Sequence, residues 1–308
     1  MASLKEIKTR IGSVKNTLKI TSSMKLVASA KLHRAQSAIE SLLPYSQRLE
    51  EILKRVTDNL QGPIPNLPLS RESTTRTGND STKRIALVAI SSSTSLCGGF
   101  NNNLIRFAHQ VIREYKEQGV GLHLIPIGRK VAQSLDTIEG TQADNHFVTI
   151  GEKPTYAEAA ALATHLTDLY LTGEVDRVEI LYTHYKNMAV QTLTRKQYLP
   201  VVENHPQDNH HAPSTPLHKD AWGGEASCIL EPSASQLLAD LLPQAQAMRF
   251  YAILLDSSAA EHAARTFAMQ TATDNGEALL HELNLQYNKV RQQAITNELL
   301  DIVGGQMR

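Results

Sequence analysis

The chain has 308 residues, enough for one large domain or two ordinary ones, and its 31 lysines and arginines balance its 31 aspartates and glutamates. Because the net charge is zero, no global field favours nucleic acid or an anionic membrane as a partner. Two cysteines, no run of 18 apolar residues and no secretory signal indicate a soluble protein facing the cytosol, without a disulfide framework.

Residues 3–58 are predicted to form one long helix. Alternating steps of three and four residues from Leu4 to Val56 meet sixteen positions, of which thirteen are apolar. A 3.5-residue repeat sustained over this length indicates a coiled-coil face, and such a helix needs a partner. Pro44 lies inside the segment, where its missing N–H is expected to kink the helix or to free one hydrogen bond.

The first half of this helix is strongly basic. Between residues 5 and 34 the only acid is Glu6, against eight cations: Lys5, Lys8, Arg10, Lys15, Lys19, Lys25, Lys31 and Arg34. A solvated helix face is the plainer interpretation, and contact with an acidic protein partner is the sharper alternative.

A linker and then an α/β block follow. Residues 61–83 are rich in Pro, Ser, Thr, Gly and Asn, which is typical of a linker. After it, runs of strand length alternate with helical spacing, which favours a parallel or mixed sheet covered by helices. Strands are predicted at 84–90, 123–127 and 177–185 and helices at 104–118 and 156–171, with a hairpin partner strand within 189–202 and a short strand at 228–230.

The loop that follows the first strand, residues 91–100, lies where doubly wound folds bind nucleotides. It has neither a G-x-G-x-x-G pattern nor a P-loop lysine, so nucleotide binding is disfavoured. Gly98-Gly99 instead indicates a tight turn with positive φ, and Cys97 is expected to be a structural thiol. His205, His210, His211 and His218 match no metal-site spacing and lie in a Pro- and Asn-rich stretch, which favours a solvated loop.

A second long helix is predicted from about residue 233 to 303, with Gly304-Gly305 as the stop signal. Its seam from Leu238 to Asp301 has thirteen apolar positions in nineteen. Gly276 is read as a small seam residue at a close helix approach, with a break at Asp274-Asn275-Gly276 as the alternative. Pairing with the first helix is expected to end near residue 285, so the last residues project unpaired and require a partner.

Polar residues interrupt both seams. Thr21 and Lys25 in the first seam fall roughly opposite His262, Thr266 and Thr273 in the second. Such residues can fix the register of a helix pair, and the alternatives are a partly wet seam or outward contacts within a larger assembly.

Several stretches closely resemble the gamma subunit of F-type ATP synthases, in the family's order and over essentially the whole chain. They are Lys5-Glu6-Ile7, residues 16–28 (NTLKITSSMKLVA), residues 96–99 (LCGG), residues 272–276 (ATDNG) and residues 287–299 (YNKVRQQAITNEL). The resemblance implies an α/β fold in which the terminal helices form a long antiparallel coiled coil with an inserted Rossmann-like domain. The implied units are residues 1–60, a linker at 61–83, the α/β foot at 84–232, and residues 233–308.

The same resemblance implies a rotor that couples ion flow to ATP synthesis or hydrolysis, regulates ATPase activity, and has no catalytic residue, cofactor or metal of its own. The implied partners are the alpha and beta subunits of the catalytic hexamer, the epsilon subunit and the ring of c subunits, with no nucleic acid. The implied location is the cytoplasmic face of the bacterial inner membrane, which the chain meets only through the complex. Whether protons or sodium ions drive the ring is left open.

Six partner contacts carry over by motif from the resemblance. Met24 and Arg265 are expected to face the moving lobes of the beta subunits, and four residues near the chain end are expected to contact the catalytic collar: Arg291, Gln292, Thr296 and Glu298. The chain departs from the family at Ser93-Thr94-Ser95, where Asp-Arg-Gly is usual, and at Thr266, where methionine is usual. Lys25 also stands where the family often has an acidic or neutral residue.

Two rival functions remain. A scaffold or adaptor with a coiled-coil arm needs the same heptads but not the polar, Arg- and Glu-bearing end of residues 287–303. A Rossmann-type enzyme needs a phosphate loop or paired acid and base residues in the middle block, and the sequence offers neither.

Overall fold

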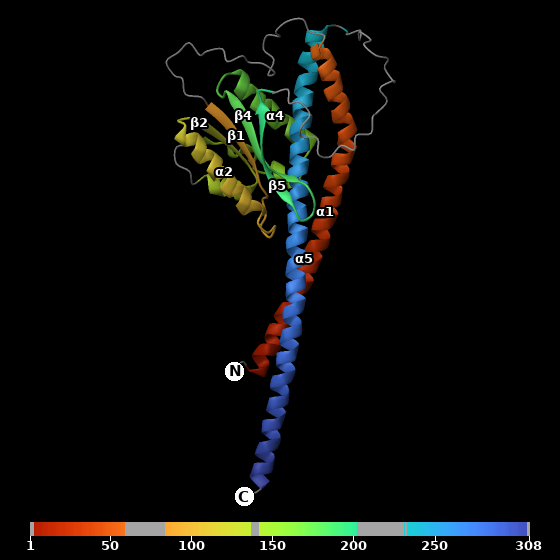
Figure 1. Cartoon of the computed structure of the whole chain (residues 1–308), viewed down its shortest axis with the longest axis vertical. Helices are drawn as coiled ribbons and strands as arrows, with labels where there is room; N and C mark the ends of the chain where they lie inside the picture. Colours follow the sequence, from red (N-terminus) through yellow and green to blue (C-terminus); the bar gives the residue numbers. More distant parts are fainter. Residues whose placement is uncertain (1–2, 59–83, 137–141, 202–230, 232, 307–308) are drawn as a thin grey trace.

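The protein is a long pair of helices with a sheet domain packed against one half of it (Figure 1). In the computed structural model, residues 3–58, 84–136, 142–201, 231 and 233–306 are described. Helix α1 spans Leu4–Asp58 and helix α5 spans Ala234–Gln306. The expected loops at 61–82 and 203–223, with their four histidines, and the expected strand at 228–230 lie outside the described residues.

The helix pair is antiparallel, as the two seams predict. All sixteen heptad positions of α1 from Leu4 to Val56 are buried or half-buried, whereas most of its other residues are exposed. Three contacts fix the register in the half away from the sheet. They join Leu18 to Gly276, the hydroxyls of Thr21 and Thr273 at 3.1 Å, and Lys25 Nζ to Gln270 Oε1 at 2.8 Å.

Both helices continue through the residues that usually interrupt or end a helix. Helix α1 continues through Pro44, and α5 continues through Gly276, which confirms the seam interpretation over the alternative of a break. The predicted stop at Gly304-Gly305 is wrong, because α5 runs to Gln306. Glycine lowers helix propensity by about 1 kcal/mol, and this alone does not force a helix to end.

The sheet domain, described over residues 84–136 and 142–201, confirms the strands predicted within those ranges. Its five strands lie in the order β3-β2-β1-β4-β5. The first four are parallel, and β5 returns antiparallel to β4 as the expected hairpin partner. The strands are β1 (Arg84–Ile90), β2 (Gly121–Ile127), β3 (Gln142–Ala143), β4 (Arg177–Tyr185) and β5 (Gln191–Leu199).

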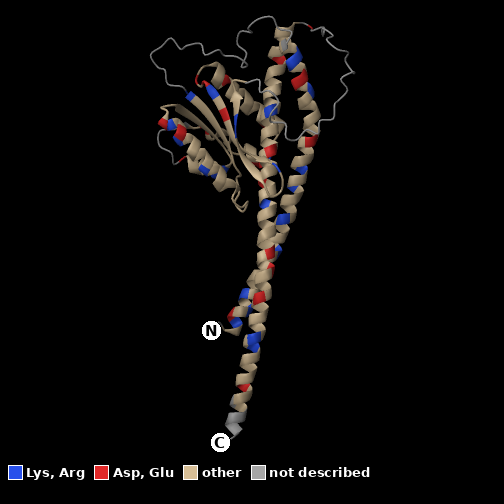
Figure 2. Cartoon of the chain, viewed as in Figure 1, with Lys and Arg blue, Asp and Glu red and all other residues tan. Residues whose placement is uncertain are grey.

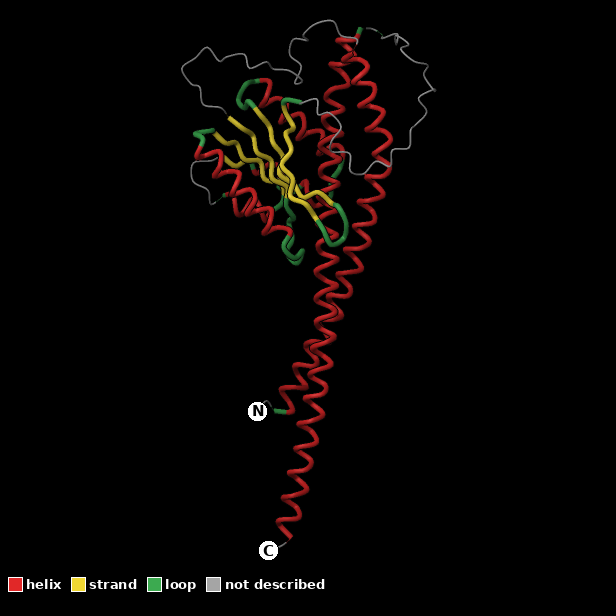
Figure 3. Tube along the Cα trace, viewed as in Figure 1, coloured by secondary structure: helices red, strands yellow, loops and turns green. Residues whose placement is uncertain are grey.

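Helices cover both faces of this sheet (Figure 3). They are α2 (Phe100–Glu117), α3 (Arg129–Leu135) and α4 (Tyr156–Leu171), with short 3-10 turns at Asn145–Phe147 and Ile150–Glu152. Helix α4 matches its prediction, α2 begins four residues earlier than expected, and α3, β3 and the 3-10 turns were not predicted. Because side chains alternate along a strand, Leu87 packs toward α2 while Val88 packs toward α4.

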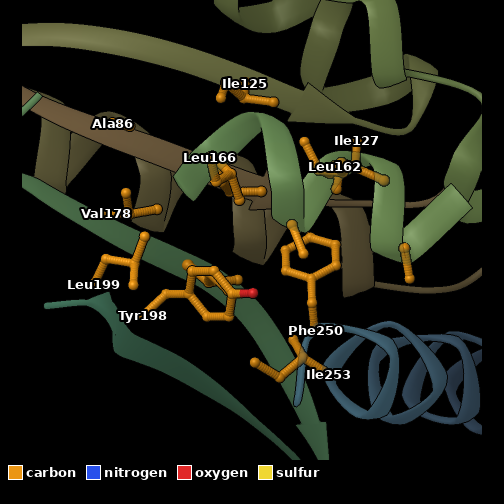
Figure 4. Packing of buried hydrophobic residues seen from close by; sticks show 14 of the residues in the cluster. Ala86, Ile125, Ile127, Leu162, Leu166, Val178, Tyr198, Leu199, Phe250 and Ile253 are labelled. Atoms are coloured by element: carbon orange, nitrogen blue, oxygen red, sulfur yellow. The ribbon is translucent and has the colours of Figure 1, made fainter. Parts of the chain in front are cut away.

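Helix α5 completes the core on the α4 side of the sheet. Phe250 and Ile253 of α5 point into the same cluster as Leu162 of α4 and Tyr198 of β5 (Figure 4). Phe250 is fully buried, and its ring meets that of Tyr198 edge to face with centroids 5.7 Å apart. The sheet domain therefore shares a hydrophobic core with α5 and is not merely linked to it by the chain.

Candidate functional site

In the half of the helix pair away from the sheet domain, α1 and α5 approach each other unusually closely at Gly276. A Cβ added there would lie 2.6 Å from Leu18 Cδ2, closer than non-bonded carbons approach. At the neighbouring seam position the Thr273 hydroxyl donates to the Thr21 hydroxyl, whose own hydrogen goes to the Leu18 carbonyl. This stretch combines a small residue with polar ones, and it fixes the register that the rest of the pair follows.

Beyond α1, helix α5 continues alone. The register set at Leu18 carries Leu4 to the level of Val290, slightly past the expected residue 285. The overhang, residues 291–306, then projects by roughly 24 Å at 1.5 Å per residue, and Figure 1 shows it passing the N-terminal end. Its apolar side chains are open to solvent, with Ile295 48%, Leu299 58% and Ile302 60% exposed.

The four residues predicted to contact the collar all lie on this overhang and are all exposed. They are Arg291, Gln292, Thr296 and Glu298. The Thr296 hydroxyl donates to the Gln292 carbonyl at 2.9 Å, so the two residues stack one helical turn apart on the same face. An unpaired helix with exposed apolar side chains needs an external surface to hold it, because it otherwise frays.

Helix α1 presents a second open surface. Seven of its eight N-terminal cations are exposed, and Lys25 is half-buried through its bond to Gln270; Figure 2 shows the charges along this helix. Met24 is half-buried, and Ile20 and Val27, which lie one turn away on the same side, are 60% and 57% exposed. Met24 therefore belongs to an apolar outer stripe flanked by cations.

Arg265 sits differently from the other predicted contacts. It is 9% exposed, and both terminal nitrogens of its guanidinium are bonded inside the chain. One terminal nitrogen donates to Glu261 Oε1 at 2.6 Å and the other donates to Thr94 Oγ1 at 2.7 Å and Ser92 Oγ at 3.3 Å. This link between α5 and the loop after β1 was not foreseen from the sequence.

The loop after β1 is itself tightly held. Asn101 Oδ1 accepts from the Ser92 N–H at 3.0 Å, and Asn101 Nδ2 donates to the Thr94 carbonyl at 3.1 Å. Gly98 has φ of +59°, as predicted, but Gly99 has φ of −81° and forms the N-cap of α2, so its predicted positive φ is wrong. The second left-handed residue is Leu96, with φ of +67°.

Cys97 is a structural thiol, as the sequence predicts. It is 2% exposed and packs with Phe100, Ala260 and Ala264. Burial raises the pKa of the thiol above its usual value, which the nearby Arg265 only partly opposes. Among the described residues no three His, Cys, Asp or Glu side chains gather as a metal site would require, and no helix is apolar enough to span a membrane.

Comparison with known proteins gives a consistent result. A family profile described as "ATP synthase" matches residues 3–307. The chain is 48% identical to an ATP synthase gamma chain of Bacteroides fragilis over 309 residues, covering all of both chains. It is 36% identical to an ATP synthase gamma chain of Flavobacterium johnsoniae over 305 residues, covering 99% of this chain and 98% of that one.

Solved structures show the same fold. The structure described as the Euglena gracilis mitochondrial ATP synthase OSCP/F1/c-ring contains a chain with a TM-score of 0.59 and 18% identity, covering 99% of this chain and 93% of that one. A chain of the rotor of the same synthase has a TM-score of 0.58 and 17% identity, covering 95% of this chain and 98% of that one.

Proposed function

The chain belongs to the family of ATP synthase gamma chains, and from this premise we propose how its surfaces serve a rotary complex. As a member of this family it is the central-stalk rotor subunit of an F-type ATP synthase and is not itself an enzyme, since the catalytic sites lie in the beta subunits. Its work is mechanical: stiff helices and their side contacts transmit rotation to those sites.

The overhang is the observation that carries the proposal. Residues 291–306 leave the helix pair with Ile295, Leu299 and Ile302 exposed, and a collar of alpha and beta subunits supplies the sheath that such a helix needs. Arg291, Gln292, Thr296 and Glu298 make the polar contacts with this collar. A single helix inside a bore is also asymmetric, so that different beta subunits meet different faces of it.

Lateral contacts complete the coupling. Met24, with Ile20 and Val27 beside it, faces the moving lobes of the beta subunits, and the exposed cations around it favour acidic partner surfaces. Because the Arg265 guanidinium is occupied within the chain, its stretch of α5 meets the beta subunits through exposed neighbours such as Phe267, which is 52% exposed.

At the opposite end, the sheet domain, as part of the 84–232 unit, forms the foot on the ring of c subunits, with epsilon beside it. Its position at the end of the helix pair far from the C-terminus supports this assignment (Figure 1). The complex then lies at the cytoplasmic face of the bacterial inner membrane, and this chain meets the membrane only through its partners. The remaining units are the helices at 1–60 and 233–308 and the linker at 61–83.

Co-assembly tests the proposal against its rivals. The chain, expressed with the alpha and beta subunits of the same organism, is expected to purify in one fixed ratio with a hexamer whose ATPase depends on it. Separate purification of the hexamer and the chain would contradict the rotor function. An ATPase activity of the chain alone would favour the enzyme alternative, and association at no fixed ratio would favour the adaptor.

A further inference from the structure

Helix α5 packs against other elements on two sides between residues 259 and 264. Ala259 and Ala263 pack against Leu32 and Ala35 of α1, and Ala260 and Ala264 pack on the other side, against Cys97 and Phe100 next to the loop after β1. Two alanine pairs, offset by one residue, let both neighbours approach the helix closely. Any rotation of the sheet domain relative to the helix pair must therefore disturb this stretch.

Arg265 adds polar contacts between α5 and the loop after β1 to this apolar packing. Its charge is balanced by Glu261, one turn earlier on the same helix, at 2.6 Å, which leaves the second terminal nitrogen for Thr94 Oγ1 and Ser92 Oγ of the sheet domain. Charge-assisted hydrogen bonds to fixed acceptors are directional as well as strong. We call Ser92, Thr94 and Arg265 the loop joint.

The other hydrogen bonds between the sheet domain and α5 lie nearer the N-terminus of the helix. The Tyr198 hydroxyl donates to the Gln246 carbonyl at 2.9 Å, and Asp256 binds His184 Nδ1 at 2.6 Å and the Tyr185 N–H at 3.0 Å. The loop joint extends this line of contacts by nine residues, about 14 Å of helix. If only one end of this line of contacts bound the sheet domain to α5, the domain could pivot on the helix. Because both ends bind it, the domain turns with the helix.

We propose that Arg265 is a positioning residue that, through Thr94 and Ser92, locks the sheet domain to α5 against twisting, so that torque passes between foot and shaft without slip. This inference rests on the proposed rotor function. The joint carries load only when the foot is attached to a turning ring. A hexamer detached from the ring hydrolyses ATP without loading it.

Thr94→Val tests the joint with little risk to folding, because Thr94 is exposed and valine has nearly the same shape without the acceptor. ATPase of the detached hexamer is expected to stay at the wild-type rate. Ions pumped per ATP by the membrane complex should fall below the wild-type ratio, because a directional, charge-assisted hydrogen bond between the domain and α5 is lost. Thr164→Val is the matched control, because the exposed Thr164 bonds only the Ala160 carbonyl of its own helix.

A covalent rescue separates positioning from a general structural defect. A Cβ on Gly98 would lie 3.6 Å from Ala268 Cβ, a separation that suits a disulfide. Because φ is +59° at Gly98, a cysteine there is strained, so the double-cysteine chain with Thr94 intact is the reference for the rescue. Gly98→Cys and Ala268→Cys are combined with Thr94→Val in a chain in which Cys97 and Cys228 are replaced by alanine. Diamide, a two-electron oxidant that takes up the two electrons and two protons as the S–S bond forms, should restore pumping per ATP, and dithiothreitol should abolish the rescue.

Wild-type pumping per ATP by Thr94→Val, or a defect that persists with the disulfide closed, would overturn the loop joint. An equal loss of ATPase in the detached hexamer would do the same, because it would show damage to the catalytic contacts. By contrast, failure of the unmodified chain to assemble with the hexamer would count against the rotor function itself.

Discussion

At the scale of single residues, Gly12 of α1 and Gly276 of α5 have opposite surroundings. A Cβ at Gly276 would meet Leu18, whereas nothing lies within 4 Å of a Cβ at Gly12. Helix propensity favours alanine at both sites by about 1 kcal/mol, so the packing decides the sign. Gly276 is a packing residue of the seam, and Gly12 has no such role within the chain.

We therefore expect Gly276→Ala to lower the thermal midpoint of the purified chain and Gly12→Ala to raise it. The clash with Leu18 costs on the order of 1–3 kcal/mol, which outweighs the gain in propensity, while Gly12→Ala keeps the gain of about 1 kcal/mol. Thermal unfolding followed by circular dichroism measures both shifts. Shifts in the same direction would contradict the close approach at Gly276.

His262 links stability to pH. Burial lowers its pKa below the usual 6.5; Glu261 opposes this shift, and Arg265 on the same helix and Lys31 of α1 reinforce it. As the pH falls through the unfolded value, the unfolded chain binds a proton that the folded chain resists, so the free energy of unfolding decreases. Above that value both states are neutral, and the effect disappears.

His262→Gln should therefore flatten the pH dependence of stability. The loss of thermal midpoint between about pH 7.5 and pH 5.5 is expected to be smaller in the variant than in the wild type. It should not vanish, because burial lowers the pKa of His123 in the same direction. An unchanged slope would show that His262 titrates alike in both states.

At the scale of elements, the sequence predicts what has a long period or a uniform apolar run. Heptads over more than fifty residues identify α1, and the runs RIALVAI and RVEILYTHY identify β1 and β4 at their observed bounds. The seven-residue α3 and the two-residue β3 were missed, because neither is long enough to show a period. The predicted helix end at Gly304-Gly305 was wrong because low helix propensity is a weak signal for where a helix ends.

The overhang allows a test by truncation. Deleting residues 300–308 leaves Arg291, Gln292, Thr296 and Glu298 in place, whereas deleting residues 286–308 removes all four together with the exposed Ile295 and Leu299. We expect assembly and ATPase of the reconstituted hexamer to survive the shorter deletion far better than the longer one. Equal losses would count against the collar contacts.

At the scale of the whole molecule, the sequence predicts which surfaces stay open better than it predicts internal contacts. The overhang and the position of Met24 off the seam follow from heptad arithmetic. The Arg265 to Thr94 link joins residues 171 positions apart, and one sequence holds no signal for such a pairing. The resemblance alone led to the expectation that Arg265 faces the beta subunits, and the structure shows its guanidinium bonded to Glu261, Thr94 and Ser92.

The central claim is that the sheet domain and the helix pair turn as one body relative to the hexamer. The direct test fixes the alpha and beta subunits to a surface and attaches a bead to a cysteine introduced at the exposed Arg113 on α2 of the sheet domain. On addition of ATP, the account predicts sustained rotation of the bead in one direction. Steady ATP hydrolysis by these complexes with a bead that does not turn would contradict it.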